Sequence, residues 1–281
     1  MATREERVDI NTGEARIEGT LVTPGTLIPG VLFVHGWGGS QQQYLARARE
    51  IASLGCVCLT FDLSGHAATQ EERAQVSRER NLRDLMAAYD VLGAHPHVDR
   101  SAIAVVGSSY GGYLAAILTT LRPVEWLALR VPALYIDTGW ELPKMQLHKD
   151  QDLHAYRRSF VPATQNRALR ACAEFQGDVL IVESELDDTV PRPVITSYRE
   201  ACVQARSLTY RCLAGADHGL TDDASQRAYT ALLVQWLGEL LPGARRGVPS
   251  AAATAAAARE GAVVAAAAEN EPEAPPGVGA G

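Results

Sequence analysis

The sequence lacks features that would direct the chain to a membrane, a nucleic acid or a secretory route. Residues 1–9 are polar and charged, without the apolar core of a signal peptide. No apolar run approaches the roughly 18 residues that a membrane-spanning helix needs. The formal net charge is −7, and no cluster of Lys and Arg forms a basic face for nucleic acid. We therefore expect a cytoplasmic protein without membrane or nucleic-acid partners.

Disulfide and zinc patterns are also missing. The chain has five cysteines, an odd number, and Cys56 and Cys58 lie inside an apolar run. The spacing of this pair is too short for the usual zinc or redox motif. Reduced and mostly buried thiols are the expectation, in keeping with a cytoplasmic location.

The sequence does contain a regular alternation of apolar runs and amphipathic stretches. Its 281 residues, 47% of them hydrophobic, suffice for one large α/β domain. The alternation predicts a mostly parallel central sheet with helices on both faces, and a turn signal at 11–13 predicts antiparallel N-terminal strands. The predicted strands are 7–10, 15–22, 31–34, 56–61, 103–106, 127–131, 179–182 and 208–213, and the predicted helices are 44–54, 80–92, 113–118, 194–205 and 229–240.

Two segments depart from this alternation. Residues 132–176 are less regular, and their place between two predicted strands suggests a short cap-like insertion. After residue 242 the chain turns to alanine and then to Pro, Gly and Glu, with no apolar stripe to bury. We therefore expect one domain over residues 1–242 and a disordered tail over residues 243–281.

The stretch Gly107-Ser108-Ser109-Tyr110-Gly111 lies between an apolar run and a helical pattern. A G-x-S-x-G sequence between a strand and a helix is typical of the tight turn that presents the nucleophile of a serine hydrolase. Glycine is needed on both sides because a side chain two positions from the serine would collide with neighbouring backbone. The alternative is a glycine-rich turn with an ordinary serine, and the rest of the chain must decide between them.

A serine nucleophile needs a base, and the base needs a carboxylate to orient it. In this arrangement the order along the chain is serine, acid, histidine. His218 follows the last predicted strand in a glycine-flanked loop, where a solvated histidine is the alternative. Asp187 follows the preceding strand, four residues before Pro191, and its reach makes it the preferred acid. The competing carboxylates of this loop are Glu183, Glu185 and Asp188.

Acyl transfer also needs two N–H donors aimed at the developing oxyanion. Tyr110, directly after the serine, would supply one. The loop 35–39, with the sequence HGWGG, follows the predicted strand 31–34, and Trp37 would supply the other. His35 is expected to support this loop rather than act as the base. The loop lacks the G-x-G-x-x-G spacing and the lysine of phosphate-binding loops.

These segments together resemble the α/β-hydrolase superfamily, in particular its dienelactone-hydrolase-like and prolyl-oligopeptidase-like esterases. The resemblance covers roughly residues 7–241 and includes the segment 62–66 (DLSGH), which is similar to the family's Asp-x-x-Gly-His. The chain departs from the pattern at Ser184 and Ala67, where these families usually have glycine. It has Ser109 where a dienelactone hydrolase has cysteine, which disfavours that specific activity.

The resemblance implies an α/β-hydrolase fold, and the residues predict a serine hydrolase for small or medium acyl substrates. Ser109, Asp187 and His218 would form the catalytic triad, and the N–H groups of Trp37 and Tyr110 the oxyanion hole. The substrate would be an ester or thioester, and no metal or organic cofactor is required. A hydrolase of short peptides and a non-catalytic binding protein are the alternatives. The oligomeric state stays open.

The insertion 132–176 is expected to set the substrate preference. Its apolar residues could line a wall of the pocket or form a small core of the insertion itself. Arg157 and Arg158 could bind an acidic substrate, but a solvated face is the expected place for both. The candidate pocket residues are Trp37, Tyr135, Trp140 and Met145.

Overall fold

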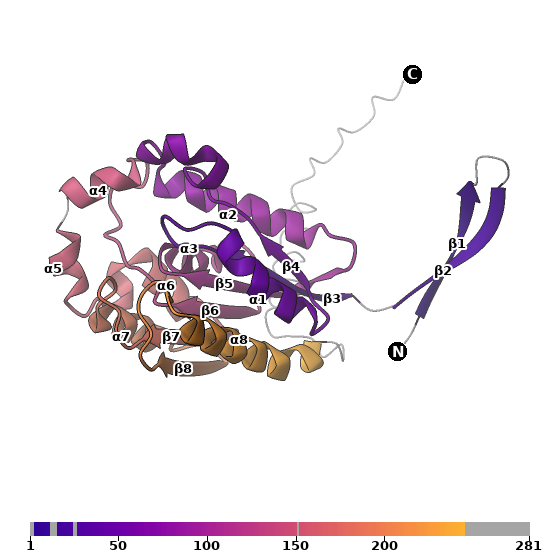
Figure 1. The fold of residues 1–281 in the computed structure, drawn as a ribbon. Helices are drawn as coiled ribbons and strands as arrows, with labels where there is room; N and C mark the ends of the chain where they lie inside the picture. The colour runs from indigo at the N-terminus through magenta and orange to yellow at the C-terminus, as the bar shows by residue number, and fades with distance from the viewer. Residues whose placement is uncertain (1–2, 12–15, 25–26, 151, 245–281) are drawn as a thin grey trace, which may run out of the picture.

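A six-stranded parallel sheet forms the centre of the computed structural model, which describes residues 3–11, 16–24, 27–150 and 152–244 (Figure 1). The strand order is β4-β3-β5-β6-β7-β8, and every neighbouring pair is parallel. The strands are β3 (Ile28–Val34), β4 (Val57–Thr60), β5 (Val98–Ser108), β6 (Trp126–Arg130), β7 (Asp178–Ser184) and β8 (Ser207–Leu213). This arrangement confirms the predicted mostly parallel sheet.

Helices cover both faces of this sheet, as predicted (Figure 1). Alternate residues of a strand point to opposite faces. Leu32 of β3 and Val105 of β5 face one core cluster, whereas Phe33 and Val106 face the other. The first cluster lies under α2 (Arg78–Gly93), α3 (Tyr110–Leu118), α6 (Arg167–Glu174) and α7 (Arg192–Ala201), and the second under α1 (Gln42–Ala52) and α8 (Asp223–Ala244).

The first two strands, β1 (Thr3–Asn11) and β2 (Arg16–Pro24), do not extend the central sheet. They pair antiparallel with each other in a separate two-stranded sheet (Figure 1). The prediction that antiparallel N-terminal strands belong to the central sheet is therefore not confirmed. Residues 12–15, which include part of the predicted turn signal, lie outside the described residues.

The segment between β6 and β7 contains most of the structure that the sequence pattern missed. It holds three α-helices and a short 3-10 helix, which are α4 (Lys144–Asp150), α5 (Leu153–Arg157), η2 (Ala163–Gln165) and α6. Another 3-10 helix, η1 (Ala67–Ala74), follows β4. These elements are short, so their apolar periodicity is hard to detect from sequence.

The last helix ends slightly beyond the predicted domain boundary. α8 runs to Ala244, whereas the boundary was expected at residue 242. The remainder of the predicted tail, residues 245–281, lies outside the described residues. Among the helices of the described ranges, none has the length and apolar character needed to cross a bilayer.

Candidate active site

Ser109 lies in a tight turn between β5 and α3 with an unusual backbone conformation. Its φ is 52° and its ψ is −117°, which a non-glycine residue rarely adopts. The Ser109 N–H donates to the carbonyl of Arg130 at 2.9 Å, and the Ser109 carbonyl accepts from Tyr113 and Ala133. These bonds hold the strained residue at the carboxyl end of the central strand β5, directly before the N-terminus of α3.

The glycines of this turn are required by the close approach of strand and helix. A Cβ at Gly107 would lie 2.6 Å from the carbonyl oxygen of Gly111. A Cβ at Gly111 would lie 2.3 Å from the carbonyl oxygen of Val34. Both distances are far below van der Waals contact, so the turn can form only with glycine at both positions.

The structure brings Ser109, His218 and Asp187 into one hydrogen-bonded chain. The loop after β8 carries His218, whose Nε2 lies 3.1 Å from Ser109 Oγ. The other ring nitrogen, Nδ1, lies 2.7 Å from Asp187 Oδ2. Because a carboxylate can only accept, Nδ1 carries the proton, and Nε2 is left to accept from the serine hydroxyl. The three side chains come from the ends of β5, β7 and β8, in the order predicted from sequence.

Asp187 is fixed as an anion by its surroundings. Its Oδ1 accepts hydrogen bonds from the N–H groups of Thr189 at 2.8 Å and Val190 at 2.7 Å, and its side chain is 4% exposed. Burial alone would raise the pKa of Asp187, but the hydrogen bonds from His218, Val190 and Thr189 outweigh it and lower that pKa below its ordinary value. The carboxylate is therefore charged and able to hold an imidazolium.

The other carboxylates of this loop are bound to groups other than His218. Asp187, the preferred acid, is the carboxylate of this loop whose contact with His218 the structure shows. Glu183 pairs with Arg192 at 3.1 Å, Glu185 accepts from the Gly215 N–H at 2.7 Å, and Asp188 accepts from the Thr189 hydroxyl at 3.0 Å.

Two backbone N–H groups near the serine have no acceptor. A Cβ at Gly36 would lie 3.3 Å from Ser109 Cβ, so the loop after β3 passes directly beside the serine. Within the described part of the chain, the amides of Trp37 and Tyr110 donate no hydrogen bond. Tyr110 is the first residue of α3, where an N–H has no intrahelical partner. Both amides are thus free to bind an oxygen outside the chain.

His35 holds the loop after β3 in place. Its Nε2 accepts from the Leu63 N–H at 3.0 Å, so Nδ1 carries the proton and donates to the Gly36 carbonyl at 2.8 Å. Burial lowers the pKa of His35, which keeps the ring neutral and both bonds intact. These contacts agree with the supporting role expected for His35.

The segment 62–66 supports the same loop from behind. The Asp62 carboxylate accepts from the backbone N–H of Gln41 at 2.8 Å and from its side-chain amide at 2.7 Å. The His66 ring meets the Trp37 indole edge-on, with centroids 4.8 Å apart. Burial, followed by the neighbouring His35, lowers the pKa of His66 to about 4, so this ring is also neutral. The Trp37 indole therefore packs on His66, whose ring in turn meets that of His35, with centroids 4.9 Å apart.

Lys144 is a residue of the site that sequence reasoning missed. This lysine begins α4 and is 2% exposed. Its Nζ lies 4.1 Å from the centroid of the Trp37 ring, 4.9 Å from that of Tyr110 and 5.1 Å from that of Tyr135. Burial lowers the pKa of Lys144. The signal available in the sequence was that the chain has only two lysines, Lys144 and Lys149.

The expectation that Arg157 lies on a solvated face is wrong, whereas its neighbour Arg158 is exposed as expected. Arg157 is 9% exposed, its Nε donates to the Leu134 carbonyl at 2.8 Å, and its guanidinium lies 4.7 Å from the centroid of the Tyr135 ring. The reason is the helical spacing of α5, which turns Leu153 and Arg157 toward the core together.

The four candidate pocket residues differ in their contacts with the residues around the serine. Trp37 and Tyr135 contact the ring of Tyr110 edge-on, with centroids 5.5 and 5.8 Å apart. Trp140 instead stacks on Tyr113, one turn further along α3. Met145 is 47% exposed on α4. A role of these four residues in substrate binding stays a prediction.

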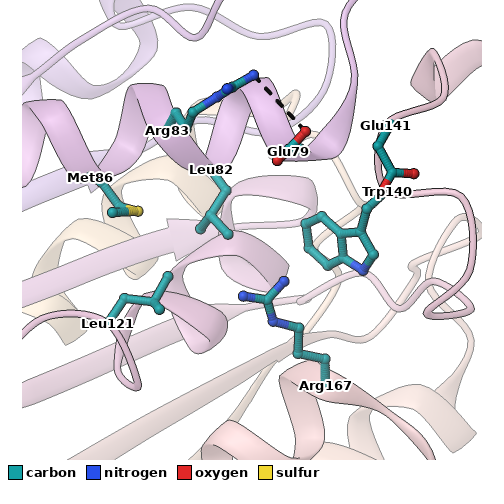
Figure 2. A pocket seen from close by; sticks show the side chains of 8 residues that line it. All are labelled: Glu79, Leu82, Arg83, Met86, Leu121, Trp140, Glu141 and Arg167. Atoms are coloured by element: carbon teal, nitrogen blue, oxygen red, sulfur yellow. Dashed lines mark ion pairs between the residues drawn. The ribbon is translucent and has the colours of Figure 1, made fainter.

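Trp140 also lines a hollow of about 470 Å³ beside α2 (Figure 2). Leu82 and Met86 of α2 form one wall, and Arg167 faces the Trp140 indole with its guanidinium 4.7 Å from the ring centroid. Ser109, His218 and Asp187 do not line this hollow.

Comparisons with known proteins point to one family. Residues 41–243 match the prolyl oligopeptidase family, peptidase family S9. A stretch of 112 residues is 30% identical to the mitochondrial palmitoyl-protein thioesterase ABHD10 of Pongo abelii. That match covers 39% of this chain and spans about a third of the relative's length, 35%.

Solved structures with the same architecture are more distant in sequence. A metagenome-derived lipolytic enzyme superposes with a TM-score of 0.58 at 19% identity, over 76% of this chain and 96% of that chain. Dienelactone hydrolase from Anabaena variabilis superposes with a TM-score of 0.53 at 20% identity, over 83% of this chain and 96% of that chain. These likenesses establish the α/β-hydrolase fold. The chain belongs to the prolyl oligopeptidase family.

Proposed function

We propose that the chain hydrolyses carboxylic esters or thioesters of small to medium acyl groups through an acyl-enzyme on Ser109. The observation that carries this proposal is the hydrogen-bonded chain from Asp187 through His218 to Ser109. It lies beside the free amides of Trp37 and Tyr110. A nucleophile with an oriented base and two unpartnered N–H groups is the minimum set for acyl transfer.

The first half of the reaction forms the acyl-enzyme. Ser109 Oγ attacks the carbonyl carbon while His218 Nε2 takes the hydroxyl proton. The charge that develops on the carbonyl oxygen is bound by the Trp37 and Tyr110 amides, and the N-terminal end of α3 favours it further. Asp187 stabilises the imidazolium while the proton is on His218. The imidazolium then protonates the leaving alcohol or thiol, and the bond to the leaving group breaks.

The second half releases the acid and restores the enzyme. A water molecule gives a proton to His218 Nε2 and attacks the acyl carbon, and the same two amides bind the second oxyanion. Collapse of this intermediate returns the proton to Ser109 Oγ. These steps use only water and groups of the chain itself.

A hydrolase of short peptides is the second candidate, and the match to a peptidase family favours it. The charges beside the proposed oxyanion loop support the ester reading instead. Three cations, Lys144, Arg78 and Arg157, lie within 6 Å of the Tyr135 ring centroid. A free peptide ammonium would be repelled by them, whereas a neutral or acidic acyl compound would not.

A substrate panel separates these candidates. We expect p-nitrophenyl esters and acyl thioesters to have a higher kcat/KM than aminoacyl p-nitroanilides, with a preference for short and medium acyl chains. Ser109→Ala should lower kcat by about 10⁴-fold while the protein stays folded. Faster turnover of the anilides would assign a peptidase instead. Turnover of no substrate in the panel would favour a binding protein on the same fold.

A further inference from the structure

A second cavity, which is polar, lies behind the loop that carries His218. It has a volume of about 130 Å³ and is enclosed by α1, α8, the ends of β5 and β6, and residues 219–220. Its inner wall includes Arg47, Ser108, Arg130 and Tyr229, all of them buried, and Gln43 is exposed at its edge. Ser109 does not line this cavity, so it is separate from the site described above.

Two buried arginines meet in this cavity without an acid. Arg47 is 7% exposed and Arg130 is 6% exposed. Their guanidinium carbons lie 5.1 and 5.6 Å from the centroid of the same ring, that of Tyr229. Among the described residues, no carboxylate lies within ion-pair distance of either side chain. Two positive charges therefore lie beside the same aromatic ring.

The hydrogen bonds of these arginines go only to neutral groups. Arg47 donates to the Gln43 carbonyl at 2.9 Å, and Arg130 donates to the His218 carbonyl at 2.9 Å and to the hydroxyls of Ser108 and Ser184.

Arg47 Nε, in the cavity wall, is buried and forms no hydrogen bond with any described residue. The Tyr229 hydroxyl is also buried, and its polar neighbour is the Ser108 hydroxyl. A buried charge without a counterion destabilises the folded state, and a buried donor without an acceptor does so to a smaller extent. Negative charge entering the cavity would compensate both.

We propose that this cavity binds a small tetrahedral oxyanion, phosphate or sulfate, between Arg47 and Arg130. The guanidinium group donates paired N–H bonds that match the oxygens of such an anion. The volume of about 130 Å³ has room for a single small anion and is too small for a nucleotide. The Tyr229 and Ser108 hydroxyls can donate to the remaining oxygens.

The anion would also brace the catalytic loop. Arg130 Nη2 donates a hydrogen bond to the backbone carbonyl of His218. The next two residues of this loop, Gly219 and Leu220, line the cavity. An anion bound to Arg130 and Arg47 would tie this loop and β6 to α1. Binding to the native state alone then raises the melting temperature in proportion to the logarithm of the anion concentration above Kd.

Thermal unfolding of the full chain at constant ionic strength tests the proposal. Phosphate and sulfate should each raise Tm by several degrees, about 5 °C at a hundredfold excess over Kd, with the rise beginning at low millimolar concentration and then following the logarithm of the anion concentration. Chloride at the same ionic strength should give little change. The general stabilising effect of these salts grows roughly in proportion to concentration and becomes large only at higher concentration, so the logarithmic rise from low millimolar concentration separates the two effects.

Matched variants locate the site. Arg47→Met should abolish the rise at low millimolar anion concentration, whereas Arg49→Met, which changes an exposed arginine on the same helix, should retain it. Tyr229→Phe should weaken apparent phosphate affinity by about tenfold through loss of one hydrogen bond to a charged group, which keeps the test decisive if Arg47→Met fails to fold. Equal anion curves in the wild type and in Tyr229→Phe, or a rise with chloride but not with phosphate, would overturn the proposal.

Discussion

Ser109 has a strained backbone conformation. A non-glycine residue at positive φ destabilises the fold by on the order of 1–3 kcal/mol, and the surrounding hydrogen bonds must offset this strain. The backbone bonds of Ser109 with Arg130, Tyr113 and Ala133 contribute to this. The Ser109 hydroxyl is thereby fixed within reach of His218, which would lower the entropic cost of the proposed reaction.

The steric demand of the turn gives a prediction for Gly111→Ala. A Cβ there would lie 2.3 Å from the Val34 carbonyl oxygen, so β3 or α3 must shift. We expect a loss of unfolding free energy on the order of 3 kcal/mol and a loss of esterase activity. Urea denaturation measures the first. Gly238→Ala is the control, because nothing lies within 4 Å of its Cβ and alanine favours the helix by roughly 0.5–1 kcal/mol. Equal stability of the two variants would contradict this account.

The choice of acid can be tested with two neighbouring residues. Asp187→Asn keeps the size of the side chain but removes the charge that orients His218, so kcat should fall by about 10⁴-fold. Asp188 is exposed and bonded to Thr189, and Asp188→Asn should leave kcat nearly unchanged. Steady-state kinetics on one p-nitrophenyl ester compares them. A larger loss in Asp188→Asn would assign the role to the other carboxylate.

Residues of the site were predictable from sequence where the fold orders them along the chain. Ser109, Asp187 and His218 each follow a recognisable strand, so their order and loop position locate them. The burial of Lys144 and Arg157 was not predictable, because it depends on aromatic rings contributed by distant loops.

At the scale of elements, the regular strands and helices of the parallel sheet were predictable, since each is long enough to carry its own pattern. The short helices of residues 132–176 were not. Their place is set by contacts made far along the chain, such as the bond from the Lys144 N–H to the Val76 carbonyl at 2.8 Å. Arg78 is likewise fully buried at the start of α2, because the carbonyls of Ile136 and Thr138 accept hydrogen bonds from its guanidinium group.

The buried histidine of the loop after β4, His66, should make the free energy of unfolding depend on pH. Burial lowers the pKa of His66 to about 4, against about 6.5 in an unfolded chain. Between these values the unfolded chain binds a proton that the folded chain does not, so stability is full above pH 6.5 and falls as the pH drops toward 4. At pH 5 this one group should lower the free energy of unfolding by about 2 kcal/mol relative to neutral pH.

Denaturation in urea at pH 7 and pH 5 measures this loss. His66→Asn keeps a donor at the position of Nδ1 but cannot be protonated, so the difference between the two pH values should shrink. His154→Asn is the control, because His154 is exposed on α5 and its imidazole lies in water in both states. An unchanged difference in His66→Asn would show that another group causes the acid sensitivity.

At the scale of the whole molecule, the six-stranded sheet gathers loops from the ends of β3, β5, β7 and β8 at one edge. Ligand sites of parallel α/β sheets form at this carboxyl edge. Helix α8 closes the opposite face of the sheet from the insertion, and the arginine cavity lies on the side of α1 and α8. The proposed anion site thus lies directly behind the His218 loop, and Arg130 contacts both sites.

The composition of the C-terminal residues gives a prediction for the whole chain. Residues 245–281 contain mainly Ala, Pro, Gly and Glu and have no apolar stripe to bury. A chain ending at Ala244, the last residue of α8, should therefore keep its Tm and its turnover nearly unchanged. Differential scanning calorimetry compares the two chains. A fall in Tm of more than about 5 °C would mean that the tail contributes to the folded core.

The proposed role of Ser109 as the activated nucleophile can be tested by labelling the full chain with a fluorophosphonate, followed by peptide mass spectrometry. One phosphonyl adduct, on Ser109, should form in the wild type. It should be lost in Ser109→Ala and form much more slowly in His218→Ala. An adduct on another serine, or an unmodified Ser109 in a folded protein at excess reagent, would contradict it.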